Sequence, residues 1–181
     1  MKVVNVLFDP TAFENIKVVV EGAVYDRDLD GEILVTDRED LVNLAKLSRK
    51  FSISFTLRHN ESSDIQATLT LESGLQNLAA ELLGTDQSLH LAGCAVTVGF
   101  RLRHPNEKDF FFEIQKVLER IWGRDRTIKQ TVSVNPLKEE PDILNEVTVT
   151  FNRLVLEDQI EDLAEMVVYI IASLKELETF I

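Results

Sequence analysis

Apolar and polar residues alternate along this chain with two periods, one of three to four residues and one of two. The longest helical period runs from Leu156 to Ile181, where apolar residues recur at spacings of three and four: Ile160, Leu163, Ala164, Val167, Ile170, Ile171, Leu174, Leu177 and Ile181. Met166 and Val168 widen this apolar surface to about 200°, against the ~100° stripe of an ordinary surface helix. The pattern predicts a central core helix lying on a sheet, with a subunit interface as the alternative.

Three further segments have helical spacing and residues typical of helix ends. Thr36 is a candidate N-cap for a helix that ends near Lys50. A second helix is predicted from Ser73 to a stop at Gly84, and a third from Asn106 to Gly123. In the third helix Phe110, Phe111 and Phe112 point about 100° apart, so at least one ring must lie off the core face. A short helical piece or turn is expected at residues 11–15.

The period of two, together with valine-rich runs, predicts the strands. Residues 51–58 alternate strictly between apolar and polar, and 65–71 do the same after a polar turn, which indicates a hairpin. Ile16 to Tyr25 is rich in valine and is predicted to be a strand, because β-branched side chains suit a pleated sheet. The other expected strands are residues 2–8, 32–35, 88–103, 128–134 and 147–151, with a polar loop at 135–145 before the last of them.

These elements predict an α+β fold with a mostly antiparallel sheet and helices packed on one face. Each half of the chain has the order strand, helix, strand, strand, helix, and the first half has two extra strands in front. The chain is expected to be a single domain, residues 1–181, or two fused structural halves, 1–86 and 87–181. In element order alone it resembles the duplicated architecture of the TATA-box-binding protein, which is a fold-level analogy and implies no function.

The outward positions of the predicted strands are mostly serine and threonine. Four cations join them: Arg58, Arg101, Arg103 and Lys129. Threonine suits exposed strand positions in general, so this composition can be a plain solvent-exposed face. The alternative is a mildly basic platform for an anionic ligand or for a second copy of the protein.

Charge and cysteine content limit the classes of function. The formal net charge of −12 disfavours binding to nucleic acid and to anionic membranes, and it suits a basic protein partner. Cys94 is the one cysteine, so no internal disulfide can form and a reducing, cytoplasmic location is expected. No apolar run reaches the ~18 residues of a membrane span, and Met1 to Phe8 lacks the features of a signal peptide.

One segment has the spacing of a calcium loop. Acids occupy its first, third, fifth and twelfth positions with glycine at the sixth, so the candidate ligands are Asp26, Asp28, Asp30 and Asp37 around Gly31. Carboxylates at these spacings can converge on one cation. The alternative is a tight acidic turn in which Asp30-Gly31 supplies the bend.

The remaining residues do not form a recognisable catalytic or cofactor motif. His59, His90 and His104 are scattered, with His59 and His104 expected in surface loops, and Cys94 is expected to be a buried small hydrophobe. No nucleophile elbow, phosphate-binding loop or dinucleotide fingerprint is present, so no cofactor is predicted.

The sequence therefore predicts a non-catalytic, soluble protein that forms a homodimer or binds another protein. The net charge of −12 favours a basic protein as that partner. Its candidate interface residues are Phe111, Phe112, Met166 and Tyr169. The alternative is a binding protein or enzyme for a small anionic ligand that uses the Ser/Thr/Arg face of the sheet.

Overall fold

A computed structural model describes residues 11–59, 65–83, 88–137 and 141–180. The strand predicted at residues 2–8 lies outside this range. The elements are, in order, α1 (Thr11–Leu29), β1 (Ile33–Asn43), β2 (Ser48–Leu57), β3 (Ile65–Ser73), α2 (Leu75–Leu83), β4 (Gly93–Pro105), α3 (Lys108–Trp122), β5 (Thr127–Ser133), β6 (Asp142–Thr150), β7 (Val155–Leu156) and α4 (Ile160–Leu177). Three single 3-10 turns accompany them, at Leu89–Leu91, Glu157–Gln159 and Glu178–Phe180.

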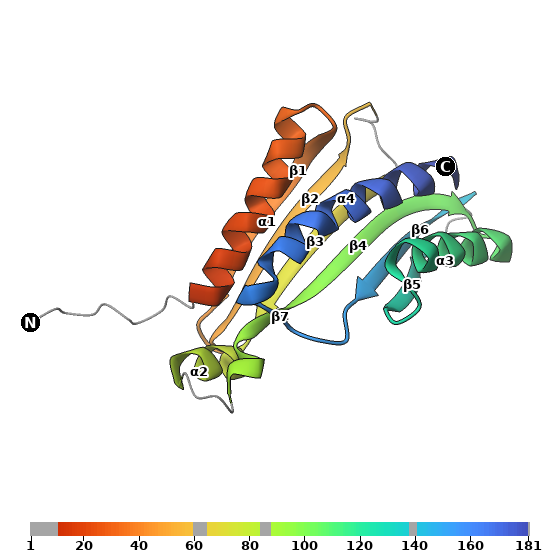
Figure 1. Cartoon of the computed structure of the whole chain (residues 1–181). Coiled ribbons are helices and arrows are strands. Elements are labelled where there is room, and N and C mark those ends of the chain that lie inside the picture. The colour runs from red at the N-terminus through yellow and green to blue at the C-terminus, as the bar shows by residue number, and fades with distance from the viewer. Residues whose placement is uncertain (1–10, 60–64, 84–87, 138–140, 181) are drawn as a thin grey trace, which may run out of the picture.

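The strands form one antiparallel sheet of seven strands. Its order is β1-β2-β3-β4-β6-β5, and β7 pairs with the start of β4 (Figure 1). The pairing of β3 with β4 joins the first and second halves of the chain in a continuous sheet. The predicted α+β class and its antiparallel sheet are therefore confirmed, and β1 and β5 are the outer edges.

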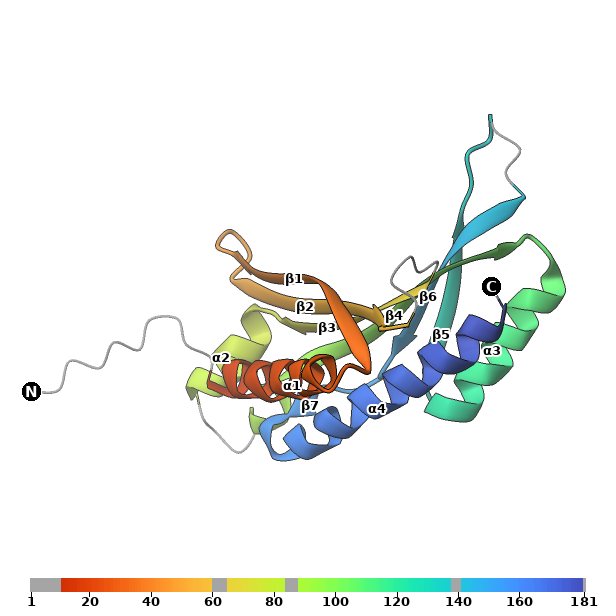
Figure 2. The same ribbon diagram turned by 90° about the horizontal axis from the view of Figure 1, so that it is seen from above.

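Three helices lie side by side on the same side of this sheet (Figure 2). Helix α4 runs between α1 and α3, and its Leu163, Val167, Ile170 and Leu174 are at most 1% exposed. They pack into a core with inward strand residues such as Phe55, Leu69 and Val98. The prediction of a central core helix is confirmed, whereas α2 lies at one end of the strands.

The valine-rich segment at residues 16–25 is helical, so the predicted strand there is wrong. It belongs to α1, in which Phe13, Ile16, Val20 and Val24 are buried and face the core. Their spacings of three and four are those of one helical face. Burial of this face outweighs the modest preference of valine for strands, because helix propensities differ by less than about 1 kcal/mol per residue.

The helix predicted from Thr36 to Lys50 is also wrong, since the segment forms β1 and the start of β2. Strand β1 is an edge strand, and its inward positions carry charged residues that pair with α1 rather than an apolar stripe. Arg38 pairs with Glu21, and Lys17 Nζ lies 2.8 Å from an oxygen of Asp40. A bulge between Val35 and Asp37 further interrupts the alternation from which a strand is recognised.

These two changes alter the predicted element order. The described first half has the order helix, three strands, helix, so the two halves do not share the expected sequence of elements and the analogy based on it fails. Two smaller findings concern α2 and β6. Leu75, Leu82 and Leu83, which belong to the apolar helical pattern of α2, are exposed. Strand β6 begins at Asp142, within the predicted polar loop.

Candidate functional site

The side of the sheet opposite α1, α3 and α4 is covered by no described helix, and we call it the open face. Its outward residues form rows of directly paired neighbours across the sheet. One row crosses from edge to edge and consists of Asp37, Ser54, Thr68, Gly99, Thr148 and Lys129. An acid thus stands on the β1 edge and a base on the β5 edge, with small and hydroxyl-bearing residues between them.

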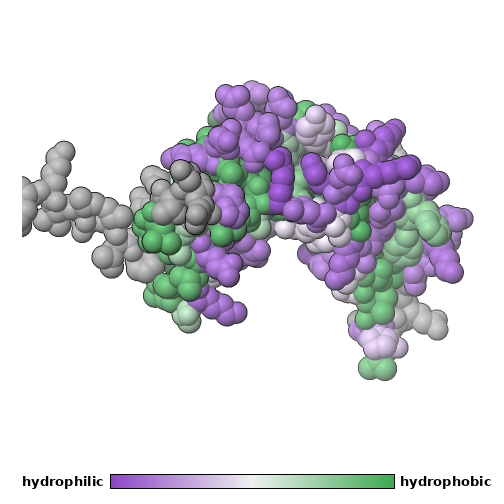
Figure 3. All heavy atoms as spheres, turned by 60° about the horizontal axis from the view of Figure 1, so that its bottom comes forward, coloured by the Kyte–Doolittle hydropathy of each residue, from purple (hydrophilic) through white to green (hydrophobic). Residues whose placement is uncertain are grey.

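The middle of the open face is recessed, because the sheet curves. The β1–β2 and β5–β6 hairpins rise on this side at opposite ends of the sheet (Figure 2), and the surface between them is hollowed (Figure 3). Ser54 is 8% and Thr56 only 1% exposed although no helix of the described residues covers them. Their hydroxyls bond within the sheet: Ser54 Oγ lies 2.8 Å from Thr68 Oγ1, and Thr56 Oγ1 donates to the carbonyl of Ile65 over 3.0 Å.

The charges of the open face are balanced rather than basic, which corrects the expectation of a mildly basic platform. Arg101, Arg103 and Lys129 lie on it, but β1 contributes Asp37 and Glu39 because this segment is a strand. Glu72 and Glu146 also have outward register positions. Arg58 does not join the other cations, since its guanidinium donates to Asp28 Oδ1 and to the Asp28 carbonyl, over 2.6 and 3.0 Å.

Apolar side chains are exposed on both hairpins that flank the hollow. The β1–β2 hairpin carries Leu41, Val42 and Leu44, and the β5–β6 hairpin carries Val132, Val134 and Leu137, the last of which is 93% exposed. Figure 3 shows apolar residues gathered on both projections. Exposed apolar groups gathered in a patch mark surfaces that contact other macromolecules. By strand register Leu41 is on the open face, whereas Val42 and Val132 have positions of the helix side.

The four candidate calcium ligands lie near the end of α1 and on β1. Asp26 and Asp28 are in the last turns of α1, Asp30 follows it, and Asp37 is on the open face. Gly31, with φ of 77°, ends the helix, and its N–H donates to the carbonyl of Asp28. Within the described residues no three or more acidic, histidine or cysteine side chains are grouped so that they could hold a metal ion. We therefore base no metal proposal on these acids.

The candidate interface residues are separated by the fold. Phe112 of α3 and Tyr169 of α4 are exposed by 62% and 49%, whereas Met166 is buried and Phe111 is half-buried. The ring of Phe111 lies edge-on to His104 at 4.9 Å. His104 is therefore wrongly expected in a surface loop: β4 extends to Pro105, and the imidazole is 1% exposed. The predicted burial of Cys94 is confirmed.

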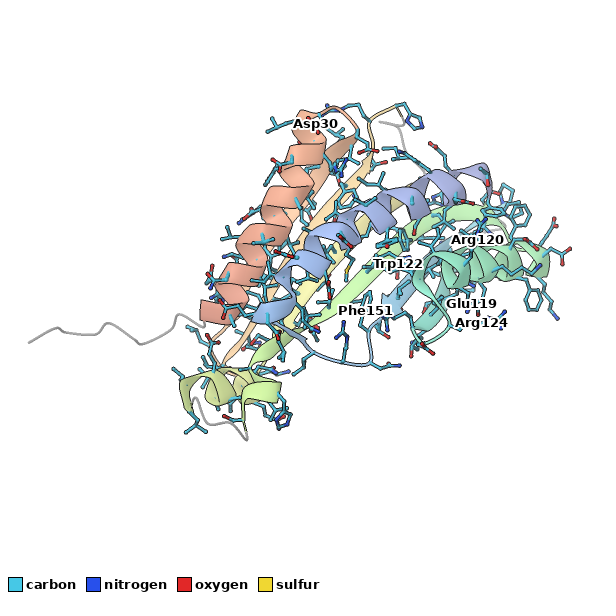
Figure 4. The ribbon with its side chains drawn as sticks, viewed as in Figure 1. Asp30, Glu119, Arg120, Trp122, Arg124 and Phe151 are labelled. Atoms are coloured by element: carbon cyan, nitrogen blue, oxygen red, sulfur yellow. The ribbon has the colours of Figure 1, made fainter. Side chains whose placement is uncertain are left out.

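A pocket that the sequence did not predict lies on the helix side, where α3, α4 and the segment between β6 and β7 meet. Its volume is about 320 Å³. Trp122 at the end of α3 and Phe151 after β6 come together there (Figure 4), with ring centroids 5.8 Å apart. Tyr169 of α4 is the third ring, 6.0 Å from Trp122. These residues come from three separate elements, so no spacing in the sequence groups them.

In comparisons with protein-family models, curated proteins and solved structures, nothing matches this chain. Among the described residues, every helix is too short or too polar to cross a membrane. The open face and the pocket are therefore the two candidate sites of this protein.

Proposed function

We propose that this protein acts without catalysis, by protein–protein contact, and that the open face binds a second copy of the chain to form a homodimer. The observation that carries this proposal is the row from Asp37 to Lys129, in which opposite charges stand on opposite edges of the same face. Six adjacent strands span about 24 Å at the usual spacing. A face with one acidic and one basic edge is complementary to itself.

The symmetry of the dimer follows from this charge arrangement. Two open faces are brought together by a two-fold axis that runs parallel to the strands through the middle of the row. The acidic edge of each copy then faces the basic edge of the other, and the same contact is made twice, as a two-fold interface requires. The chain as a whole has a net charge of −12, so its copies repel one another unless they meet through a surface without excess negative charge.

The shape and composition of the open face also support the proposal. The raised hairpins carry the exposed apolar residues, such as Leu44 and Leu137, so the rims would supply apolar contact area. The recessed floor consists largely of serine and threonine, and hydroxyls there can keep ordered water between the two sheets. The single cysteine, Cys94, fits a reducing compartment such as the cytoplasm.

The alternative function, the binding or conversion of a small anionic ligand at this face, has weaker support. A site for a small anion would need the cations to converge, but Arg58 is engaged by Asp28 at the end of α1. Glu146 is paired in register with Arg101, and its carboxylate would repel an anion bound there.

The test is a pair of charge-reversed variants measured by light scattering after gel filtration. Asp37→Lys with Glu39→Lys makes both edges basic, and Lys129→Glu makes both edges acidic. We expect the unmodified protein to have twice the 20.6 kDa mass of one chain. Each variant alone should be monomeric, and an equimolar mixture of the two should recover the dimer, because both contacts are then complementary.

The control is Asp158→Lys with Glu161→Lys, which makes the same change in charge at exposed positions of the helix side. This variant should remain dimeric. A monomeric unmodified protein at all concentrations would overturn the proposal, as would charge-reversed variants that dimerise unchanged. If the equimolar mixture of the two charge-reversed variants stays monomeric, the proposed pairing of acidic and basic edges is wrong.

A further inference from the structure

The pocket at the junction of α3 and α4 has apolar walls and a fixed aromatic side. Ile121, Val155, Leu163 and Met166 line it together with the three rings of Trp122, Phe151 and Tyr169. Trp122 is held in place, since its indole Nε1 donates to Ser173 Oγ over 3.0 Å and that hydroxyl donates to the carbonyl of Tyr169. The pocket has a volume of about 320 Å³, at the lower end of the range for small-molecule sites. It therefore suits a ligand about the size of one ring with a short chain.

Arg126 gives the pocket a positive group with unused hydrogen-bonding capacity. Its guanidinium lies over the ring of Phe151, with Cζ 4.8 Å from the ring centroid. A guanidinium held over an aromatic ring can still donate hydrogen bonds from its N–H groups. Its Nε is buried and has no hydrogen-bond partner in the described part of the chain. A buried donor without a partner costs free energy, and an acceptor brought by a ligand would remove that cost.

The pocket has three further charged residues among those that line it. Arg153, Asp162 and Glu165 line it and are exposed. Water and salt screen exposed charges, so the two acids oppose an entering anion less than the half-buried Arg126 attracts it. A carboxylate can accept from Nε and a terminal nitrogen of one guanidinium at once, which is the strongest common pairing of that group.

From these contacts we propose that the pocket binds a small carboxylate with an apolar, ring-bearing body. The carboxylate accepts hydrogen bonds from Arg126, and the body lies against Trp122 and Tyr169. The site is on the helix side of the sheet and is independent of the proposed dimer contact on the open face.

The intrinsic fluorescence of the protein provides a direct measurement, because Trp122 is its single tryptophan and lines the pocket. The probe is 3-phenylpropionate, and its matched control is phenethylamine, which has the same ring and chain length but a positive charge. Titration with 3-phenylpropionate should change the Trp122 emission with a Kd on the order of 1 mM, typical of a small ligand with one charged anchor. Phenethylamine should bind at least about tenfold more weakly, because it lacks the charge-assisted bond to Arg126.

Two variants test the role of Arg126. Arg126→Gln should weaken binding of 3-phenylpropionate by at least about tenfold, which is the effect of losing one charge-assisted hydrogen bond. Arg124→Gln is the control: it makes the same charge change two residues away, where the side chain is 90% exposed and lies 4.0 Å from Glu119 (Figure 4). It should leave the affinity within about twofold, since exposed charges are screened.

Arg126→Lys keeps a cation over Phe151 but removes Nε, so it serves if the glutamine variant fails to fold. Thermal unfolding monitored by circular dichroism checks both variants, and the lysine variant should also bind the carboxylate several-fold more weakly. A flat titration with 3-phenylpropionate would overturn the proposal. So would equal or tighter binding of phenethylamine, or unchanged affinity in a folded Arg126 variant, which would move the site elsewhere.

Discussion

The side-chain nitrogen of Asn145 lies 3.0 Å from Nε2 of His104, in the core beneath α3. The same nitrogen donates to Oε1 of Gln130 over 2.9 Å. Because the two amide hydrogens serve these two acceptors, His104 carries its proton on Nδ1, which donates to the carbonyl of Pro105 over 2.8 Å. Gln130 in turn donates to the carbonyl of Phe111, so the network joins β4, β5 and β6 to α3.

Replacing Asn145 by alanine should lower the free energy of unfolding by about 2–4 kcal/mol, because it leaves buried acceptors on His104 and Gln130 without a donor. Urea denaturation measures the change. The control is Asn43→Ala in the exposed β1–β2 turn, where the amide accepts from the Lys46 N–H. That loss should be at most about 1 kcal/mol. Equal losses in the two variants would contradict a structural role for the buried network.

Stability should fall in acid because of the ion cluster between α1 and the β1–β2 strands. Burial by itself would raise the pKa of Glu14, but hydrogen bonds from Lys17 and Arg49 outweigh it and lower the pKa below the ordinary value of 4.5. A carboxylate with a lowered folded pKa stabilises the native state above the unfolded pKa, and this contribution disappears as the pH falls through the folded pKa.

Glu14→Gln should therefore reduce the loss of stability between neutral pH and pH values below 4.5 by about 1 kcal/mol. Urea midpoints at a series of pH values provide the measurement. Glu113→Gln, at an exposed pair with Lys116, should keep the acid dependence of the unmodified protein. The interpretation is wrong if Glu14→Gln loses as much stability in acid as the unmodified protein.

Two glycines should respond to alanine in opposite directions. At Gly93, where β4 pairs with β7, a Cβ would collide with the carbonyl oxygen of Val155 and lie 2.8 Å from Leu156 Cδ2. Gly93→Ala should thus cost about 2 kcal/mol or more. At Gly22 in α1 a Cβ meets nothing within 4 Å. Gly22→Ala should stabilise by about 0.5–1 kcal/mol, because alanine is the better helix former. Thermal unfolding of both variants tests this contrast.

Cys94 should be nearly inert in the native protein. Burial raises the pKa of its thiol to about 12, so the reactive thiolate is scarce at neutral pH. We expect a thiol reagent to label the native protein slowly and the protein in denaturant rapidly. Because Cys94 is the only cysteine, the labelling ratio reports the opening of the core directly. Labelling of the native protein at the rate of a free thiol would show that the pairing of β4 with β7 does not protect Cys94.

The errors in the sequence-based fold are concentrated where two signals disagreed. In α1, Val20 and Val24 have helical spacing, but the run of valines has strand propensity, and the prediction followed propensity. In β1, an edge strand, Arg38 and Asp40 occupy the positions that face the helices. A strand is usually recognised in a sequence by apolar residues at such inward positions, and here they are charged. Asn145 was expected in a polar loop, although it is fully buried by partners on β4 and β5.

The sequence by itself determined the fold class and most central elements: the alternation of Phe51, Ile53 and Phe55 predicts β2, and the apolar face from Leu163 to Leu174 predicts α4. These signals are local, because each element buries one face and so has its own period. Only the tertiary structure decided that Asp37 shares a face with Lys129, and that Arg126 and Trp122 line a pocket with Tyr169. Such groupings depend on strand order and helix packing, which connect residues far apart in the chain and leave no period in the sequence.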